Sequence, residues 1–179
     1  ATGEVNSCGV TSTGVMYCWG WSLSSTPRPQ VLAQRFVPGG EAVGKHHVCA
    51  LTTTGQTYCW NVQPVVDYGQ RGTGSGGGDG LVATSSRFAK LSSGFYTTCG
   101  LTSDGTAYCW GYNSAGQIGD STTANRVVPV QVRTSARFTS LSVGTDHVCG
   151  VATDGLLFCW GGNSSGQLGV GDNIERLVP

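Results

Sequence analysis

Eight cysteines are the residues whose type and spacing could do chemistry in this chain. They form four pairs with nine intervening residues each, and a tryptophan directly follows the second cysteine of each pair. Such thiols could bind zinc, exchange electrons or form disulfides. Structural zinc hooks are shorter, with about two to four intervening residues, and no Cys-x-x-Cys redox motif is present. The pairs are Cys8 and Cys18, Cys49 and Cys59, Cys99 and Cys109, and Cys149 and Cys159.

The turn inside each pair predicts how its two strands align. Residues 103–105 read Ser-Asp-Gly, which fits a three-residue hairpin loop with glycine in the left-handed conformation. Thr102 then pairs with Thr106. Counting outward places Cys99 opposite Cys109, with Cα atoms about 4.5 Å apart and within reach of a disulfide. The same count holds in every pair, so we expect four cross-strand disulfides; eight reduced thiols in an intracellular protein are the alternative.

The cysteine pairs mark a repeat that indicates the architecture. Their first cysteines are spaced by 41, 50 and 50 residues, and periods of about 40–50 residues are typical of propellers and repeat arrays. Glycine-bounded, β-rich segments predict strands at 138–143, 147–152 and 156–160, with an outer strand at 127–132 beside a proline. We therefore expect one all-β domain of four-stranded antiparallel blades, with repeats at about 1–34, 35–86, 87–136 and 137–179.

The repeat resembles that of the regulator-of-chromosome-condensation family. The shared pattern is Gly-x-x-His-x-Cys, an Asp-Gly turn and Tyr-Cys-Trp-Gly-x-Asn-x-x-Gly-Gln-(Leu/Ile)-Gly, best seen at 144–169 and 94–119 and weaker at 44–60 and 3–20. The resemblance implies a β-propeller, usually of seven blades in this family, of which this chain carries about four. We expect an arc of a larger propeller, or one that other copies complete. The cysteine pairing is similar to that of extracellular members, such as crinkly-type receptor-kinase ectodomains.

Composition and residue patterns exclude several function classes. Ten Lys and Arg balance ten Asp and Glu, so nothing favours a nucleic-acid partner, and no long apolar run predicts membrane insertion. His47 and His147 precede cysteines by two positions, but the equivalent residues are Asn6 and Thr97, so no ring of metal ligands forms. Acidic residues and serines lack the companions that acid–base or nucleophilic catalysis needs. We expect no catalytic residue, metal or cofactor.

Residues that differ between repeats are the candidates for binding. The two residues after each inner-strand glycine vary completely, and loops on a rigid scaffold commonly carry recognition. The inserts 21–32 and 61–86 form a second candidate surface. Asn163 begins an Asn-Ser-Ser sequon and is a candidate glycosylation site, although the matching Asn113 has no sequon, which favours a structural role in the loop. The candidate binding residues are Glu4, Val5, Lys45, His46, Phe95, Tyr96, Thr145 and Asp146.

These observations predict a secreted or cell-surface propeller that acts as a binding or structural scaffold. Paired cysteines favour an oxidising, extracellular location. The expected partner is another protein, or further copies of the chain that pair through open blade edges. A guanine-nucleotide exchange regulator, by family analogy, and a propeller enzyme are the alternatives, and analogy of fold is weak support for either.

Overall fold

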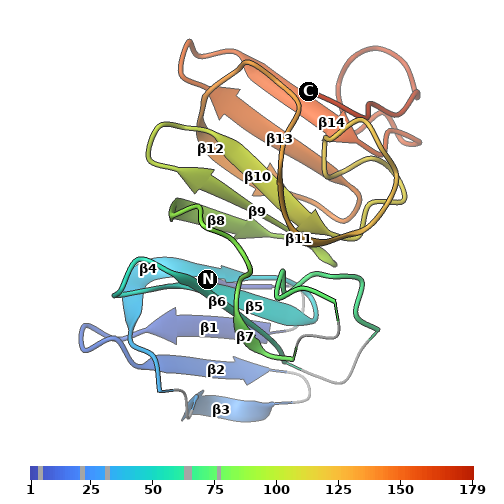
Figure 1. Ribbon diagram of the computed structural model, residues 1–179. Coiled ribbons are helices and arrows are strands. Elements are labelled where there is room, and N and C mark those ends of the chain that lie inside the picture. Colours follow the sequence, from blue (N-terminus) through green and yellow to red (C-terminus); the bar gives the residue numbers. More distant parts are fainter. Residues whose placement is uncertain (4–5, 21–22, 31–32, 63–65, 76–77) are drawn as a thin grey trace.

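The computed structural model describes residues 1–3, 6–20, 23–30, 33–62, 66–75 and 78–179. Every regular element in these ranges is a β-strand, as the turn-rich, β-branched sequence predicts. The same ranges contain no helix that is long and apolar enough to cross a membrane. Figure 1 shows the strands grouped into small sheets that follow one another from the N-terminal to the C-terminal part of the chain.

In the described ranges the strands form four antiparallel sheets, which we call blades 1 to 4, and neighbours in the chain are neighbours in each sheet. Blade 1 contains β1 (Asn6–Val10), β2 (Met16–Gly20) and β3 (Ser24–Pro29). Blade 2 contains β4 (Phe36–Val43), β5 (His47–Thr52), β6 (Thr57–Asn61) and β7 (Gly80–Leu81). Blade 3 contains β8 (Phe88–Ser93), β9 (Thr97–Thr102), β10 (Ala107–Gly111) and β11 (Arg126–Gln131). Blade 4 contains β12 (Phe138–Val143), β13 (His147–Ala152) and β14 (Leu157–Gly161).

The expected strands of blades 3 and 4 lie within one residue of the observed ones. β12 and β13 have the predicted bounds, whereas β11 begins one residue earlier and β14 one residue later. Leu156 belongs to the turn, since its carbonyl accepts a hydrogen bond from the Ala152 amide. Among the described residues, blades 1 and 4 have three strands instead of four. The remaining edge of each is reduced to a single bridge, Thr2 with Ser7 and Gly161 with Arg176.

The cysteines form the four expected cross-strand disulfides. Gly105 has a positive φ of 81°, and the Thr102 amide donates to the Thr106 carbonyl, which closes the three-residue loop. The turn chemistry therefore determines the register that brings the sulfurs together. The paired Cα atoms are 4.1 Å apart in each disulfide. The disulfides join Cys8 with Cys18, Cys49 with Cys59, Cys99 with Cys109, and Cys149 with Cys159, and each pair lies directly opposite in its hairpin.

The disulfide of blade 4 differs from the other three in its exposure. Cys149 and Cys159 are only half-buried, whereas each of the six other cysteines is at most 2% exposed. The difference follows from position, because blades 1 to 3 each have a following blade that covers the disulfide. Blade 4 is the last blade that the described residues form. The predicted pairing of Cys159 with Cys149 is thus confirmed, but this disulfide lies at the surface instead of in the core.

The core of the protein lies between blades. At each interface the disulfide of one blade packs against a phenylalanine and a tryptophan of the next. The two rings lie 5.5–5.9 Å apart at every interface. Burying a tryptophan removes about 150–250 Å² from water, an upper bound of about 4–6 kcal/mol. The contacts place Cys8 and Cys18 against Phe36 and Trp60, Cys49 and Cys59 against Phe88 and Trp110, and Cys99 and Cys109 against Phe138 and Trp160.

The Gly-Gln-x-Gly tail of a blade is held by the tryptophan of the following blade. Trp110 Nε1 donates a 3.0 Å hydrogen bond to the carbonyl of Gln70, and Trp160 Nε1 donates one of the same length to Gln117. Blade 1 has no such tail in its sequence, and Trp60 Nε1 has no hydrogen-bond partner among the described residues. The repeated tail is thus an interface element, which explains why it recurs.

The inner strands end in glycines because adjacent blades approach closely there. The Lys45 amide donates a 3.1 Å hydrogen bond to the Gly94 carbonyl of the next blade. A Cβ on Gly44 would lie 2.5 Å from that carbonyl oxygen, and a Cβ on Gly94 would overlap with the carbonyl oxygen of Gly144. Only glycine permits this spacing, so the residues after each glycine are brought side by side.

Candidate binding face

The turns after the inner strands lie at the ends of the blades opposite the disulfide hairpin loops. In blade 2, Lys45 and His46 join β4 to β5, and in blade 3, Phe95 and Tyr96 join β8 to β9. These four predicted binding residues come together. Glu4 and Val5, which we predicted as part of the same surface, lie outside the described residues.

Aromatic rings from blades 2 and 3 pack together at these turns. Tyr96 is central: its ring stacks on His46 at 4.9 Å and meets Phe95 edge-on at 4.7 Å. His46 also contacts the edge of Phe95 at 5.5 Å. Lys45 Nζ lies 4.2 Å from the centre of the Phe95 ring, a cation–π contact. Each aromatic pair contributes about 0.5–1.5 kcal/mol beyond burial, so the rings are held in place.

Two further tyrosines extend this cluster, and the sequence reasoning did not single them out. Tyr68 lies 5.0 Å from Tyr96 and 4.9 Å from Tyr112. Tyr68 belongs to the insert 61–86, part of the second candidate surface, so the two candidate surfaces meet here. Tyr112 was missed because it follows the Cys-Trp-Gly segment and not an inner-strand glycine. The available signal was the difference between repeats at this position, where blade 4 has Gly162. We call His46, Tyr68, Phe95, Tyr96 and Tyr112 the aromatic face.

The tyrosines of the aromatic face are half-buried, with one consequence for their ionisation. Burial raises the pKa of Tyr96, and the neighbouring Tyr68 adds to the effect, while Lys45 opposes it. The Tyr96 hydroxyl therefore stays protonated and can donate a hydrogen bond to a partner. Ring centroids about 5 Å apart leave no room for a ligand between the rings, so a partner would bind on the surface of the cluster.

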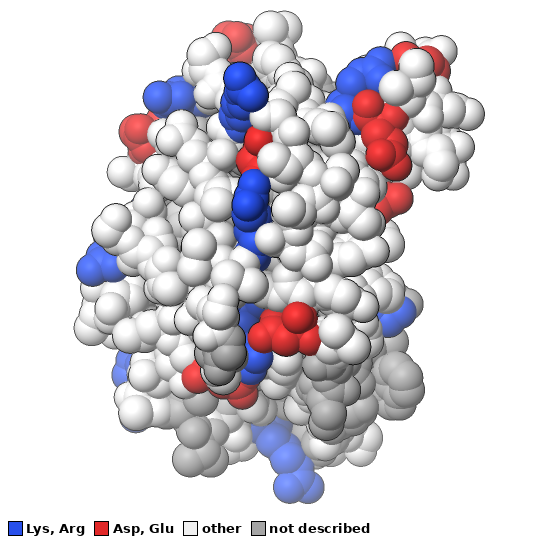
Figure 2. All heavy atoms as spheres, turned by 45° about the vertical axis from the view of Figure 1, so that its right-hand side comes forward, with Lys and Arg blue, Asp and Glu red and all other residues white. Residues whose placement is uncertain are grey.

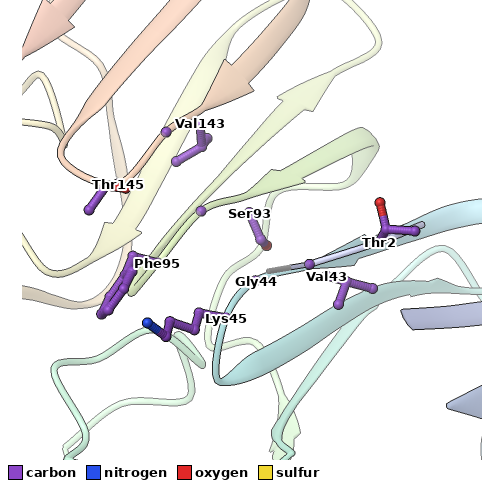
Figure 3. Close-up of a pocket in the computed structure, with 11 residues that line it drawn as sticks. Thr2, Val43, Gly44, Lys45, Ser93, Phe95, Val143 and Thr145 are labelled. Carbon is purple, nitrogen blue, oxygen red and sulfur yellow. The ribbon is translucent and has the colours of Figure 1, made fainter. Parts of the chain in front are cut away.

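A hollow runs beside the aromatic face along the inner strands (Figure 3). It has a volume of about 360 Å³. Val43 and Val143 contribute apolar side chains, and Ser93 and Thr145 contribute hydroxyls. Phe95 of the aromatic face and Lys45 also line it, and Figure 3 shows the Lys45 side chain beside the Phe95 ring. Thr145 thus faces the hollow, although it has no ring contact with the aromatic face.

Asp146 is directed toward its own blade. Its Oδ1 accepts a 3.3 Å hydrogen bond from Gln167 Nε2 and lies 3.4 Å from His147 Nδ1. The predicted set is therefore divided: blades 2 and 3 build the aromatic face, Thr145 lines the hollow, and Asp146 holds the tail of blade 4.

His47 connects two blades. It is fully buried, and its Nε2 lies 2.6 Å from the Thr98 hydroxyl of blade 3. Burial, with a smaller contribution from the charge of His46, lowers the pKa of His47 to about 3, so the ring is neutral. The described residues contain no cluster of three or more His, Cys, Asp or Glu side chains that could hold a metal ion. The geometry thus gives His47 a packing role.

Asn163 is a buried structural residue, the role that comparison with Asn113 favours over glycosylation of its sequon. Its side chain is fully buried, and Nδ2 donates hydrogen bonds to the carbonyls of Asp172 at 2.8 Å and Ile174 at 3.1 Å. A glycan on this nitrogen would have to displace the loop. Asn113 binds its own loop in the same way, through Thr122 and Ala124. The loop pattern, and not the sequon, explains this asparagine.

Charged side chains of the outer loops are paired with each other. Arg126 contacts Asp120 at 2.6 Å, Arg176 contacts Asp172 at 2.7 Å, and Arg71 contacts Asp67 at 2.6 Å. Figure 2 shows basic and acidic side chains close together on this side of the molecule. A surface of mixed sign differs from the basic stripe that phosphate backbones require.

The fold and the site define a segment of a β-propeller with one disulfide in each blade. Models described as "Regulator of chromosome condensation (RCC1) repeat" match residues 88–117 and 138–167, and a second model of the same description matches residues 104–151. The chain thus carries repeats of the RCC1 family, as its sequence pattern predicts.

Solved structures of similar fold include RCC1 from yeast and two further proteins. Yeast RCC1 (Prp20), in complex with Kap60, matches with a TM-score of 0.88 and 21% identity over 100% of this chain and 47% of that one. Human WBSCR16 matches with a TM-score of 0.82 and 19% identity over 100% of this chain and 51% of that one. The ectodomain of the receptor kinase CR4 from Physcomitrella patens matches with a TM-score of 0.59 and 25% identity over 89% of this chain and 37% of that one. The chain spans about half the length of the first two proteins, and a search of curated proteins finds no match.

Proposed function

We propose that this chain is the binding scaffold of a secreted or cell-surface protein and that it holds a protein partner at the aromatic face. The observation that carries the proposal is the contact of Tyr96 with the four other rings of the aromatic face, which come from two blades. Aromatic residues, tyrosine among them, are enriched at the centres of protein interfaces. They offer a large contact area and lose little conformational entropy on binding.

The scaffold beneath this face is suited to recognition because it is rigid. Disulfides join β5 to β6 and β9 to β10, and β5 and β9 are the strands that begin directly after the turn residues. Disulfides persist in oxidising compartments, which supports the extracellular location. The CR4 ectodomain belongs to a receptor kinase, and yeast RCC1 was solved with the protein Kap60 bound. Proteins of similar fold thus occur in a receptor and in a complex with another protein, which supports a role in protein recognition.

Partner capture with matched variants tests the proposal. The extracellular fraction of the source organism would be incubated with three tagged proteins. These are the wild type, the double variant Phe95→Ala/Tyr96→Ala and the control Leu156→Ala. Leu156 is 59% exposed in a hairpin loop at the opposite end of its blade, so its truncation leaves the aromatic face intact. Wild type and the control should retain the same proteins, and the double variant should lose them. Equal capture by all three variants, with equal melting temperatures, would refute the proposal.

Self-association is a second candidate function, favoured by the outer face of blade 4. The corresponding faces of blades 1 to 3 are covered by the following blade, whereas Val151 is 39% exposed and Leu157 is 68% exposed. The half-buried disulfide of Cys149 and Cys159 belongs to the same hairpin. A further copy of the chain could cover these side chains.

Sedimentation velocity over a range of concentrations tests self-association. Wild type should assemble as its concentration rises, and Leu157→Asp should remain a monomer because the added charge would be buried at the contact. A monomeric wild type at all concentrations would exclude this second function.

A further inference from the structure

Three of the six tyrosines of this chain lie in contact with one another in the aromatic face. Tyr68 is their hub, 4.9 Å from Tyr112 and 5.0 Å from Tyr96, while the latter two are 6.5 Å apart. Tyr68 belongs to the insert of blade 2, and both neighbours belong to blade 3. Phenol rings from two blades therefore approach each other at the surface.

These distances suit the formation of a bond between rings. Two phenols joined by a carbon–carbon bond of about 1.5 Å have centroids about 4.3 Å apart. The observed separations exceed this by less than an ångström, and thermal motion of ordered side chains covers about 0.5–0.9 Å. The rings are half-buried, so they are accessible at their edges and still confined to this arrangement.

The sulfur-containing side chains, which are easily oxidised, are protected. All eight cysteines are engaged in disulfides, and Met16, the single methionine, is only 1% exposed. Thiols and exposed thioethers would otherwise consume an oxidant first. Of the three remaining tyrosines, Tyr17, Tyr58 and Tyr108, none forms a tyrosine pair in the described structure: Tyr58 contacts Phe36 and Trp60, and Tyr108 contacts Phe88.

We infer that Tyr68 forms an oxidative cross-linking site with Tyr112 or Tyr96, at which a haem-type peroxidase and hydrogen peroxide join blade 2 to blade 3 through a dityrosine. Each phenol loses one electron and one proton and becomes a phenoxyl radical. The radicals combine at the ring carbons beside the oxygens, and the hydrogens on those carbons move to the oxygens. Two hydrogen atoms leave the protein in total, and hydrogen peroxide is reduced to two water molecules.

The inference is independent of the proposed binding function, and peptide mapping tests it. Dilute wild-type protein treated with a peroxidase and hydrogen peroxide should yield a peptide pair that contains Tyr68 and either Tyr112 or Tyr96. Its mass should be lower by two hydrogen atoms than the sum of the separate peptides. The cross-linked protein should also remain a monomer on a denaturing gel, since the bond forms within one chain.

Conservative variants provide the controls. Tyr68→Phe keeps the ring packing and removes the phenol, so the cross-linked peptide should be lost. Tyr58→Phe and Tyr108→Phe should leave its yield unchanged. The inference is overturned if no intramolecular link forms while free tyrosine in the same mixture couples, if only dimers of the chain form, or if Tyr68→Phe leaves the link intact.

Discussion

The indole Nε1 of Trp160 donates a 3.0 Å hydrogen bond to the backbone carbonyl of Gln117, and this contact attaches blade 4 to the tail of blade 3. Trp110 makes the same contact with Gln70 one blade earlier. The two halves of the sequence repeat, the Cys-Trp strand and the Gly-Gln-x-Gly tail, therefore meet across blade boundaries. The repeat encodes its own neighbour contacts, as expected for a solenoid-like or propeller array.

Replacing Trp160 by phenylalanine should destabilise the protein more than the same change at Trp60. The Trp160→Phe change leaves the Gln117 carbonyl without its donor, which costs about 1–3 kcal/mol in addition to the lost packing. Trp60 Nε1 has no partner among the described residues, so Trp60→Phe loses packing alone. Denaturant unfolding of both variants should show the difference. Equal losses would mean that the hydrogen bond does not stabilise the interface.

Gly94→Ala should destabilise the protein strongly, by about 3 kcal/mol or more, because the added Cβ would overlap with the Gly144 carbonyl. Gly80→Ala is the control, since a Cβ at that strand position meets nothing within 4 Å. It should change stability by about 0.5 kcal/mol or less. Thermal unfolding compares the two variants. A tolerated Gly94→Ala would contradict the close approach of the inner strands.

The buried His47 should make the protein less stable as pH falls below about 6.5. Its pKa is about 3 in the folded state and 6.5 when the ring is exposed to solvent, so the unfolded chain binds the additional proton between these values. Stability from this residue is fully present above pH 6.5 and is lost as pH falls toward 3, by up to about 1.4 kcal/mol per pH unit.

The comparison variant for this pH dependence is His47→Asn, because blade 1 has Asn6 at the equivalent position. Unfolding free energies would be measured by denaturant titration between pH 7 and pH 5. Wild type should lose more stability than the variant over this interval. Parallel pH profiles would show that His47 is not the titrating residue.

The disulfides should leave no thiol available for alkylation. Under denaturing, non-reducing conditions the intact chain should take up no alkylating reagent, and after reduction it should take up eight equivalents, one for each cysteine. The double variant Cys99→Ala/Cys109→Ala should be less stable by about 3 kcal/mol, because the unfolded chain regains the conformational entropy that the closed loop removes. Eight alkylated cysteines without reduction would contradict the disulfide assignment and remove the support for an extracellular location.

The sequence was sufficient for the fold because its signals are local and repeated. The loop 103–105 alone determines the register that pairs Cys99 with Cys109. The same count paired Cys149 with Cys159, but it could not show that this disulfide is half-buried, because burial depends on the blade that follows.

The aromatic face was predicted only in part, because contacts between blades depend on the angle and spacing of the sheets. Phe95 and Tyr96 were found from their variation between repeats, whereas Tyr68 and Tyr112 join them from distant segments. The structural role of Asn163 was favoured by comparison with Asn113, whereas its sequon does not report burial.

The central claim, that the aromatic face holds a protein partner, is tested most directly by photo-crosslinking from Tyr96. A photoreactive phenylalanine analogue would replace Tyr96 in one sample and Ser103 in another, since Ser103 is exposed in the hairpin loop at the opposite end of the same blade. After illumination in the extracellular fraction, position 96 should give a discrete covalent protein adduct, and position 103 should give none. The absence of an adduct at position 96, or identical adducts at both positions, would contradict the account.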